Sequence, residues 1–358
     1  MDVYTVEYVD REGKAGTAEY DEEENESKLD LSHRKLVSVD LEAVSRLPSL
    51  AYLDLGRNDI AEIDLSPLSS CDTLTSLDLF KNGLSSIDLE PLSKCSKLSE
   101  LNLGTNALSE VNLAPLSTLG RLARLRLFNN RLKSINLAPL SSCTGLESLE
   151  IENNAIAAVN LEPLAMCTEL RQLNLMYNQL KEIDLEPLAS CTKLKFLYLH
   201  HNALSAISLQ PLRTCTDLRI LRLAGNGLTS IDLSPLQECT SLIRLGLAMN
   251  KLTEIDLTPL SGARGLSFLD IAGNMLTKID LAPLSKCRKL AELYLFSEHP
   301  QDNAFKELDL SPLFSCEELE DLTISDDTQL VAKASLKDRE EVPDALEELV
   351  DEDRILWR

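Results

Sequence analysis

The sequence predicts an α/β solenoid: a stack of similar units bent into a horseshoe or arc and capped at both ends. We expect a parallel β-sheet on the concave face and short helical turns on the convex face. Leucine opens successive units 24 residues apart, and one unit reads LTSLDLFKNGLSSIDLEPLSKCSK (residues 74–97). A fixed period of this kind is the signature of a repeat architecture whose neighbouring units share one core.

The first half of each unit predicts a short strand. In LDLFK, Leu77 and Leu79 alternate with Asp78, which is the period of a strand with one buried face. Counting from residues 29–31 to 322–324 gives thirteen candidate strands. Asn82 and its counterparts follow these strands, and an amide both donates and accepts hydrogen bonds. We therefore expect the asparagines to satisfy backbone groups where the chain leaves the sheet.

The second half of each unit predicts a helical turn. IDLEPLSKC buries Ile87, Leu89 and Leu92, and Pro91 suits the first helical position because its missing N–H is no loss there. A face lined by strands is narrower than a back lined by helical turns, so the stack must curve.

The pattern L-x-x-L-x-L-x-x-N-x-L-x-x-I-D-L-x-P-L-x-x-C resembles the leucine-rich-repeat family across residues 29–324. The resemblance implies a stacked asparagine ladder and a ligand-binding concave face. We expect residues 1–28 to form an acidic N-terminal cap, a β-hairpin, and residues 325–358 to form a C-terminal cap. Within that cap, residues 343–357 predict a short acidic helix opened by Pro343, and residues 325–342 look irregular. The alternative is that the C-terminal tail is a docking peptide.

The nine cysteines share one column of the repeat. Leu47, Leu119 and Ala263 replace cysteine in other units, which indicates a buried apolar position. The odd number and the absence of a C-x-x-C pair favour free thiols in a reducing compartment. The N-terminus lacks the features of a secretory signal, and no apolar run reaches ~18 residues. We therefore expect a cytoplasmic chain that does not bind membranes.

A second column holds aspartates such as Asp64 and Asp88, which Asn112 and Ser208 replace elsewhere. This interchange favours hydrogen bonds to the backbone ahead of each helical turn over a calcium ladder. His200 and His201 lack a third metal ligand at a convincing spacing, so contact or pH-sensitive roles fit them better. The sequence contains no phosphate-binding loop, H-E-x-x-H or G-x-S-x-G motif. We expect neither cofactor nor catalysis.

The net charge of −23 is concentrated at the two ends, including the run Asp21–Glu24. One explanation for these acidic ends is that they keep the chain soluble. An acidic chain repels phosphate backbones, which disfavours nucleic acid as a partner.

The aromatic residues gather in the columns expected on the concave face, where the framework does not need them. Protein interfaces favour Tyr, Phe, Met and Arg, so this face is the candidate binding site for a partner protein. The candidate contact residues are Tyr52, Phe80, Arg124, Arg126, Phe128, Arg131, Met176, Tyr177, Phe196, Tyr198, His200, His201, Arg222, Arg244, Phe268, Tyr294 and Phe296.

The arginines among them favour a partner with an acidic segment. The alternative for Arg124 and Arg126 is that Glu150 and Glu152 on the next unit neutralise them. Five extra residues within 296–303 predict a rim loop with Pro300, which either joins the binding site or marks a degenerating end.

The sequence therefore predicts a monomeric, non-catalytic protein–protein interaction scaffold or adaptor. The alternative is an allosteric regulator of an enzyme such as a small GTPase or phosphatase. A calcium- or nucleic-acid-binding module is a third hypothesis.

Overall fold

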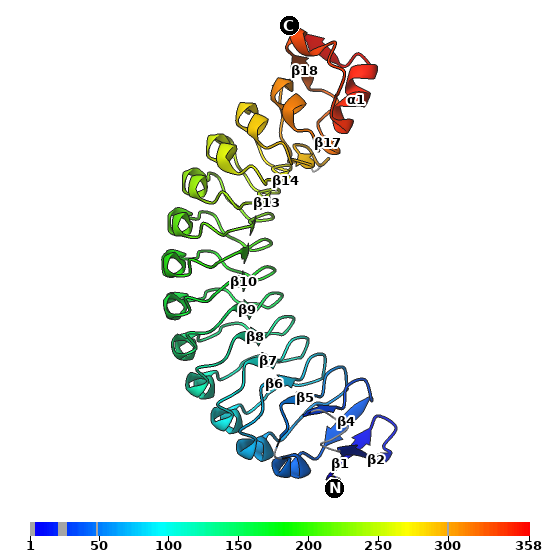
Figure 1. Cartoon of the computed structure of the whole chain (residues 1–358), viewed down its shortest axis with the longest axis vertical. Helices are drawn as coiled ribbons and strands as arrows, with labels where there is room; N and C mark the ends of the chain where they lie inside the picture. Colours follow the sequence, from blue (N-terminus) through cyan, green and yellow to red (C-terminus); the bar gives the residue numbers. More distant parts are fainter. Residues whose placement is uncertain (1–3, 21–26, 48, 299–300) are drawn as a thin grey trace. The chain divides into compact units, whose positions relative to one another are not determined.

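The structure, a computed structural model, describes residues 4–20, 27–47, 49–298 and 301–358. The acidic run Asp21–Glu24 and Pro300 of the predicted rim loop lie outside the described residues. The chain divides into two compact units, residues 1–179 and 180–358. Figure 1 shows the strands and short helical turns of both.

The first unit is a stack of 24-residue rungs joined by parallel strands. The register places Leu53 beside Leu77 and Leu101 beside Leu125. The strands are β3 (Lys28–Asp30), β5 (Tyr52–Asp54), β6 (Ser76–Asp78), β7 (Glu100–Asn102), β8 (Arg124–Arg126), β9 (Ser148–Glu150) and β10 (Gln172–Asn174). One 3-10 turn closes each rung: η1 (Glu42–Arg46), η2 (Ser66–Ser70), η3 (Glu90–Lys94), η4 (Ala114–Thr118), η5 (Ala138–Ser142) and η6 (Glu162–Met166).

The second unit repeats the same rung. Its strands are β11 (Phe196–Tyr198), β12 (Ile220–Arg222), β13 (Arg244–Gly246), β14 (Phe268–Asp270), β15 (Glu292–Tyr294) and β17 (Asp321–Thr323). Its turns are η7 (Glu186–Ser190), η8 (Gln210–Thr214), η9 (Ser234–Glu238), η10 (Thr258–Gly262), η11 (Ala282–Lys286) and η12 (Ser311–Ser315). Seven strands in the first unit and six in the second match the thirteen counted from the sequence.

The outer end of the first unit carries a small antiparallel sheet. β1 (Tyr4–Asp10) lies between β2 (Ala15–Tyr20) and β4 (Leu36–Val39). Val6 pairs with Ala18, and both are buried together with Tyr20. These strands place apolar side chains over the end of the leucine core, which a solenoid would otherwise expose.

The outer end of the second unit differs in part from the sequence prediction. The helix α1 (Asp344–Asp351) follows Pro343 but stops short of residue 357, and β19 (Ile355–Trp357) follows it. β18 (Gln329–Ala332) and the short turn η13 (Ala334–Leu336) occupy the stretch predicted to be irregular. β18 pairs in parallel with β19 and with β16 (Glu307–Asp309). This strand pairing outweighs the weak helical preference of so short a segment.

The core of each rung consists of leucines and cysteine. Leu101 and Leu103 are fully buried, and Cys95 is fully buried behind the turn. The Cys95 thiol donates to the Leu68 carbonyl of the preceding rung at 3.3 Å. Burial raises the pKa of Cys95 to about 12. All nine cysteines are buried free thiols, as expected of a structural column.

The asparagines form the expected ladder between rungs. The Asn106 side-chain amide donates to the carbonyls of Leu79 and Leu103, at 3.0 and 3.1 Å. Its Oδ1 accepts the backbone N–H of Leu84 at 3.1 Å. One side chain thus satisfies backbone groups on two neighbouring rungs.

The aspartate column caps the turns. Asp88 Oδ1 accepts the backbone N–H of Glu90 at 2.9 Å, and Asn112 Oδ1 accepts that of Ala114 at 3.0 Å. Because aspartate and asparagine make the same bond, the backbone-capping interpretation accounts for their interchange.

Candidate functional site

The surface that could receive a partner consists of five side chains per rung, here called the strand face. They are the third, fifth, seventh, eighth and tenth residues of each rung, counted from its opening leucine. In the rung that begins at Leu194 they are Phe196, Tyr198, His200, His201 and Ala203. The strand leucines between them point inward and are no more than 2% exposed, so the alternate side chains point outward.

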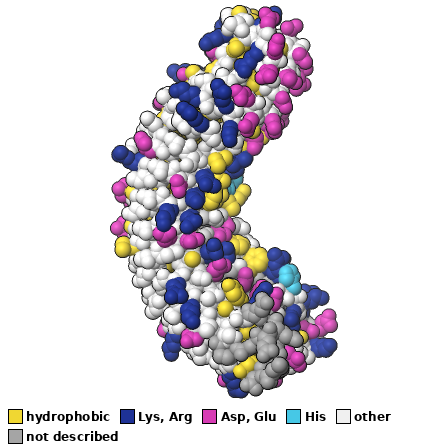
Figure 2. All heavy atoms as spheres, viewed as in Figure 1, with side chains coloured by type: hydrophobic (Ala, Val, Ile, Leu, Met, Phe, Trp, Pro, Cys, Tyr) yellow, Lys and Arg dark blue, Asp and Glu magenta, His cyan; other side chains and the backbone are white. Residues whose placement is uncertain are grey.

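Exposed hydrophobic side chains concentrate on this face. Among the described residues, eight large hydrophobic side chains are exposed, and four of these belong to the strand face: Tyr52, Tyr177, Met249 and Met275. Figure 2 shows hydrophobic side chains gathered on the side where Figure 1 places the strands. The sequence prediction named the two tyrosines as contact residues, and they are accessible.

The eighth residue of each regular rung, from the one that begins at Leu50 to the one that begins at Leu266, has a left-handed backbone. Tyr177, His201 and Met249 have φ of 51°, 54° and 53°. Glycine adopts this conformation without steric cost, yet among the described rungs only Gly225 and Gly273 use it at this position. The backbone holds large side chains outward here despite the strain, a feature that sequence periodicity alone does not reveal.

The two arginines of β8, Arg124 and Arg126, are neutralised by glutamates of neighbouring rungs. Arg126 pairs with Glu150 at 3.2 Å and with Glu100 at 3.9 Å. Arg124 pairs with Glu100 and lies 3.8 Å from Glu147. The neutralisation alternative therefore describes Arg124 and Arg126, with Glu150 rather than Glu152 as the next-rung partner.

Arg131 differs from these two. It is exposed, and no ion pair within 4.0 Å is found for it among the described residues.

Glu152 is a half-buried residue that the sequence marked only as a neutralising charge. Its Oε2 is inaccessible and has no hydrogen-bond partner within the described part of the chain. Burial raises the pKa of Glu152 to about 7, with the Glu150 charge adding to the rise and Arg126 opposing it. The partner of Arg126 is Glu150, so Glu152 gains little from that arginine.

Two phenylalanines of the first unit meet across an intervening rung. The Phe80 and Phe128 rings lie 5.8 Å apart, and Gly104 lies between them in the same column. A Cβ on Gly104 would lie 2.6 Å from the Phe128 ring, so only glycine leaves room for this contact. The Arg57 guanidinium lies 5.4 Å from the Phe80 ring centre. Both phenylalanines are half-buried, as befits an anchoring patch.

The second unit has a different cluster, built around Phe268. The prediction that Phe268 is an exposed contact is wrong, since the side chain is only 6% exposed. The guanidinium carbons of Arg222 and Arg244 lie 5.1 and 4.1 Å from its ring centre. The Tyr294 ring meets it edge to face at 5.7 Å. The surface therefore presents the arginines and Tyr294, with Phe268 as their support.

The two arginines of this cluster differ in their pairing. Arg244 forms an ion pair with Glu292 at 3.2 Å. Among the described residues Arg222 has no ion-pair partner within 4.0 Å, and it is half-buried. Gly246 lies beside it on the next strand and contributes no side chain. The Arg222 charge opposes the burial-driven rise in the pKa of Asp270, two strands further on. Because Arg222 forms no ion pair within 4.0 Å in the described part of the chain, its guanidinium can still donate to an incoming carboxylate.

Tyr198, His200 and His201 form an aromatic row next to Arg222. The rings of Tyr198 and His200 lie 6.2 Å apart, and those of His200 and His201 lie 5.5 Å apart. Burial lowers the pKa of His200 to about 4, and the charges of His201 and Arg222 act in the same direction. His200 is therefore neutral at physiological pH, which argues against a pH-sensing role for this residue. Phe196 lies beside this row and is half-buried.

Within the insertion, Ser297 and Asp302 bond to each other and Asp302 bonds to the preceding rung. Asp302 accepts the backbone N–H of Gly273 at 2.7 Å and that of Ser297 at 2.6 Å. In regular rungs a carbonyl of the next rung accepts the equivalent N–H, as Ala272 does for Met249. The Asp302 carboxylate replaces that carbonyl, so these described contacts are structural. Phe296 is half-buried beside them.

Met176 is half-buried on the seventh position of its rung. Within the described residues no group of three His, Cys, Asp or Glu side chains is placed to hold a metal ion. Over the same residues no helix has the length and apolar character needed to cross a bilayer.

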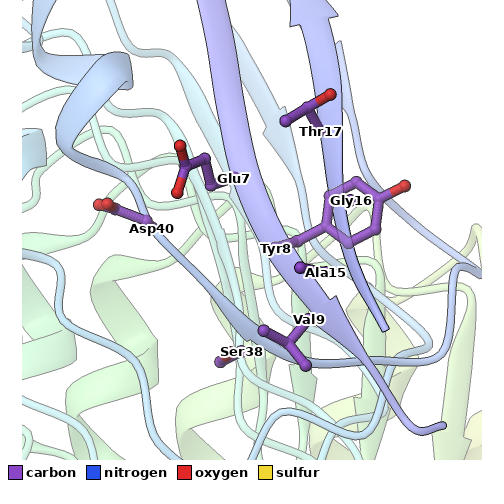
Figure 3. A pocket seen from close by; sticks show the side chains of 8 residues that line it. All are labelled: Glu7, Tyr8, Val9, Ala15, Gly16, Thr17, Ser38 and Asp40. Atoms are coloured by element: carbon purple, nitrogen blue, oxygen red, sulfur yellow. The ribbon is translucent and has the colours of Figure 1, made fainter. Parts of the chain in front are cut away.

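A hollow of about 480 Å³ lies on the small sheet of the first unit, away from the strand face (Figure 3). The Tyr8 ring lies across Gly16, where a Cβ would come within 2.6 Å of the ring. Small residues such as Ala15 and Ser38 leave the hollow shallow and open.

The repeats of this chain match the sequence model of a known protein family. A family model described as "Leucine rich repeat" matches residues 27–84, 120–180, 144–204, 168–228 and 216–276, which together make more than half of the chain. The chain belongs to the leucine-rich-repeat family. This fold is typical of protein–protein interaction scaffolds.

Solved structures of other leucine-rich-repeat proteins have the same fold as this chain. An internalin (inlF) from Listeria monocytogenes has 27% sequence identity and a TM-score of 0.67, with 86% of this chain and 90% of that chain covered. The protein LIC12759 from Leptospira interrogans has 20% identity and a TM-score of 0.75, with 88% and 76% covered.

A plant protein shows the same fold. The ectodomain of the receptor kinase GASSHO1/SCHENGEN3 from Arabidopsis thaliana, in complex with Casparian strip integrity factor 2, has 22% identity and a TM-score of 0.66. It covers 84% of this chain, but only 39% of that ectodomain is covered. A search of curated proteins gives no match.

Proposed function

We propose that this leucine-rich-repeat chain is a non-catalytic scaffold or adaptor that binds a partner protein along its strand face. The strand face carries half of the exposed large hydrophobic side chains of the described chain. Tyr, Met and Arg at such positions are the residue types that interfaces favour. The GASSHO1/SCHENGEN3 ectodomain in complex with a second molecule supports the general role.

The partner presents an acidic segment to the second unit. Arg222 is the observation that carries this proposal, since it stacks on Phe268 and has no ion pair among the described residues. A guanidinium beside Tyr198 and over the Phe268 ring combines a charge with aromatic contact area. Arg126 occupies the same place in its own rung, but Glu150 already satisfies it. The acidic segment therefore pairs with Arg222.

Affinity capture from source cells, followed by mass spectrometry, tests the proposed function. A Phe196→Ala/Tyr198→Ala/Arg222→Ala variant should lose partners that the wild type retains. A Met166→Ala/Arg213→Ala variant on the outer turns is the matched control, because Met166 is 55% exposed there and Arg213 is also exposed. Equal capture by all three proteins would refute a strand-face site. If the partner is an enzyme, its rate with and without the chain separates a scaffold from a regulator.

The chain acts as a cytoplasmic monomer in this proposal. Nine free thiols are compatible with a reducing compartment, and the acidic ends disfavour self-association. Sedimentation equilibrium checks that the chain is a monomer. Imaging of the tagged chain in source cells checks that it is cytoplasmic. A concentration-dependent dimer, or a secreted chain, would contradict these statements.

A further inference from the structure

The last rung of the second unit leaves its core partly open. In every other rung the two inward strand residues are no more than 2% exposed, and Leu293 and Leu295 of β15 are fully buried. Leu322 and Ile324 occupy the same two positions in β17 and are only half-buried. β17 is also the last strand in the order of its sheet. This apolar end therefore retains surface that burial would stabilise.

The helix α1 covers this end incompletely. Leu346 is fully buried, and the Ala345 N–H donates to the Leu319 carbonyl at 3.0 Å, so the helix is fixed to the rung. Leu349, one turn further on, stays half-buried. A groove of about 230 Å³ remains between α1, β17 and β18, and we call it the C-terminal groove. Its apolar lining includes Leu322, Ile324 and Leu349.

The rim of the C-terminal groove is acidic. Glu348 and Glu352 line it from α1 and its end, and both are exposed without an ion pair among the described residues. The one arginine of the lining, Arg354, is paired with Asp326 at 3.0 Å. Figure 2 shows further acidic side chains gathered around this end of the second unit. The groove thus combines a small apolar floor with a polar rim of net negative charge.

We propose that the C-terminal groove binds an amphipathic segment of a partner protein, with apolar side chains on the floor and lysine or arginine at the rim. Charge complementarity selects this occupant. A second copy of the chain is a poor occupant, because its acidic end would bring like charges together. An amphipathic segment is a common ligand for grooves of this kind. The site is separate from the strand face, so it stands or fails independently of the proposed function.

A synthetic peptide provides the test on the full chain. The probe is a fluorescein-labelled helical peptide with leucines on one face and lysines on the other, measured by anisotropy at low salt. Two comparison peptides carry glutamate in place of lysine or serine in place of leucine. Glu348→Lys/Glu352→Lys should weaken binding of the Leu/Lys peptide by at least about tenfold. Glu162→Lys/Glu186→Lys, which reverses two exposed glutamates on the outer turns, should change it less than about twofold.

Loss of folding would not explain the expected result. Lysine near the C-terminus of a helix is favoured by the helix dipole, so the Glu348→Lys/Glu352→Lys variant should melt no lower than the wild type. Leu349→Ser, which keeps the charges, should also weaken binding. The proposal is overturned if both glutamate pairs have equal effects, if the leucine-free peptide binds as well, or if no peptide binds. Dimerisation through this end in sedimentation experiments would likewise overturn it.

Discussion

At the residue scale, identical positions in different rungs have different properties because of their lateral neighbours. Arg126 and Arg222 occupy the same place in the repeat, yet Arg126 is paired with Glu150 and Arg222 rests on Phe268. The sequence predicted both as surface arginines. It could not assign their pairing, because side-chain rotamers choose among several neighbours at rung spacing. The burial of Phe268 under two guanidiniums escaped prediction for the same reason.

Thr105 tests how much the left-handed backbone conformation at the eighth residue of a rung lowers stability. This β-branched residue has φ of 56°, where glycine is free of steric strain. We expect Thr105→Gly to raise the free energy of unfolding by about 0.5–1 kcal/mol in urea denaturation. Thr75 has no positive φ, so Thr75→Gly is the control and should lower stability. Destabilisation of equal size in both variants would show that the backbone at the eighth residue is unstrained.

Glu152 predicts a particular pH dependence of stability. Its folded pKa is raised from 4.5 to about 7, so the folded state binds more protons than the unfolded state between those values. Its contribution is therefore neutral below pH 4.5, turns unfavourable as the pH rises, and is fully unfavourable above pH 7.

Glu152→Gln should consequently stabilise the chain at pH 8, by about 1 kcal/mol once solvent screening is allowed for, and should have less effect at pH 5. Thermal melts at the two pH values check this. Glu150→Gln is the control, because it removes the ion pair with Arg126. A Glu152→Gln variant that is equally stabilised at both pH values would contradict the account.

At the element scale, the rung was largely predictable from sequence. The L-x-L alternation gave the strands, and proline after the aspartate column gave the turns, which the structure shows as 3-10 turns such as Ser66–Ser70. Regular rungs have the same structure because each buries leucines at the same positions of the repeat. The C-terminal elements were less predictable, because β18 and β19 are short and depend on pairing with distant residues.

Adjacent residues of β11 should differ sharply in their contribution to stability. Leu197 is fully buried, so Leu197→Ala should cost roughly 2–5 kcal/mol of unfolding free energy. Phe196 and Tyr198 are half-buried on the strand face, so Phe196→Ala/Tyr198→Ala should cost less than Leu197→Ala while still abolishing partner binding. Urea denaturation measures both. Severe unfolding of the double variant would show that these two side chains are core.

The aspartate column should be indifferent to calcium. Asp232 Oδ1 accepts the Ser234 N–H at 2.8 Å, and Asp256 Oδ1 accepts the Thr258 N–H at 2.8 Å. Backbone capping thus occupies an oxygen that a calcium site would use. We expect no measurable change in melting temperature on adding calcium or a chelator. A shift of several degrees would favour the calcium hypothesis.

At the scale of the whole molecule, charge and apolar surface are distributed unequally between two candidate surfaces. The strand face offers aromatic residues with an unpaired Arg222, and the C-terminal groove offers an apolar floor with an acidic rim. The first surface favours an acidic partner segment and the second a basic one. Sequence alone located the strand face, because its columns recur every 24 residues. It did not locate the groove, which belongs to one irregular end.

The central claim is that Arg222, which rests on Phe268 and has no ion pair among the described residues, receives the partner. Capture of partners from source cells by the wild type, Arg222→Ala and Arg126→Ala tests it most directly, with circular dichroism confirming that all three are folded. Partners retained by wild type and Arg126→Ala but lost by Arg222→Ala are the predicted result. Equal retention by both variants, or loss with Arg126→Ala alone, would contradict it.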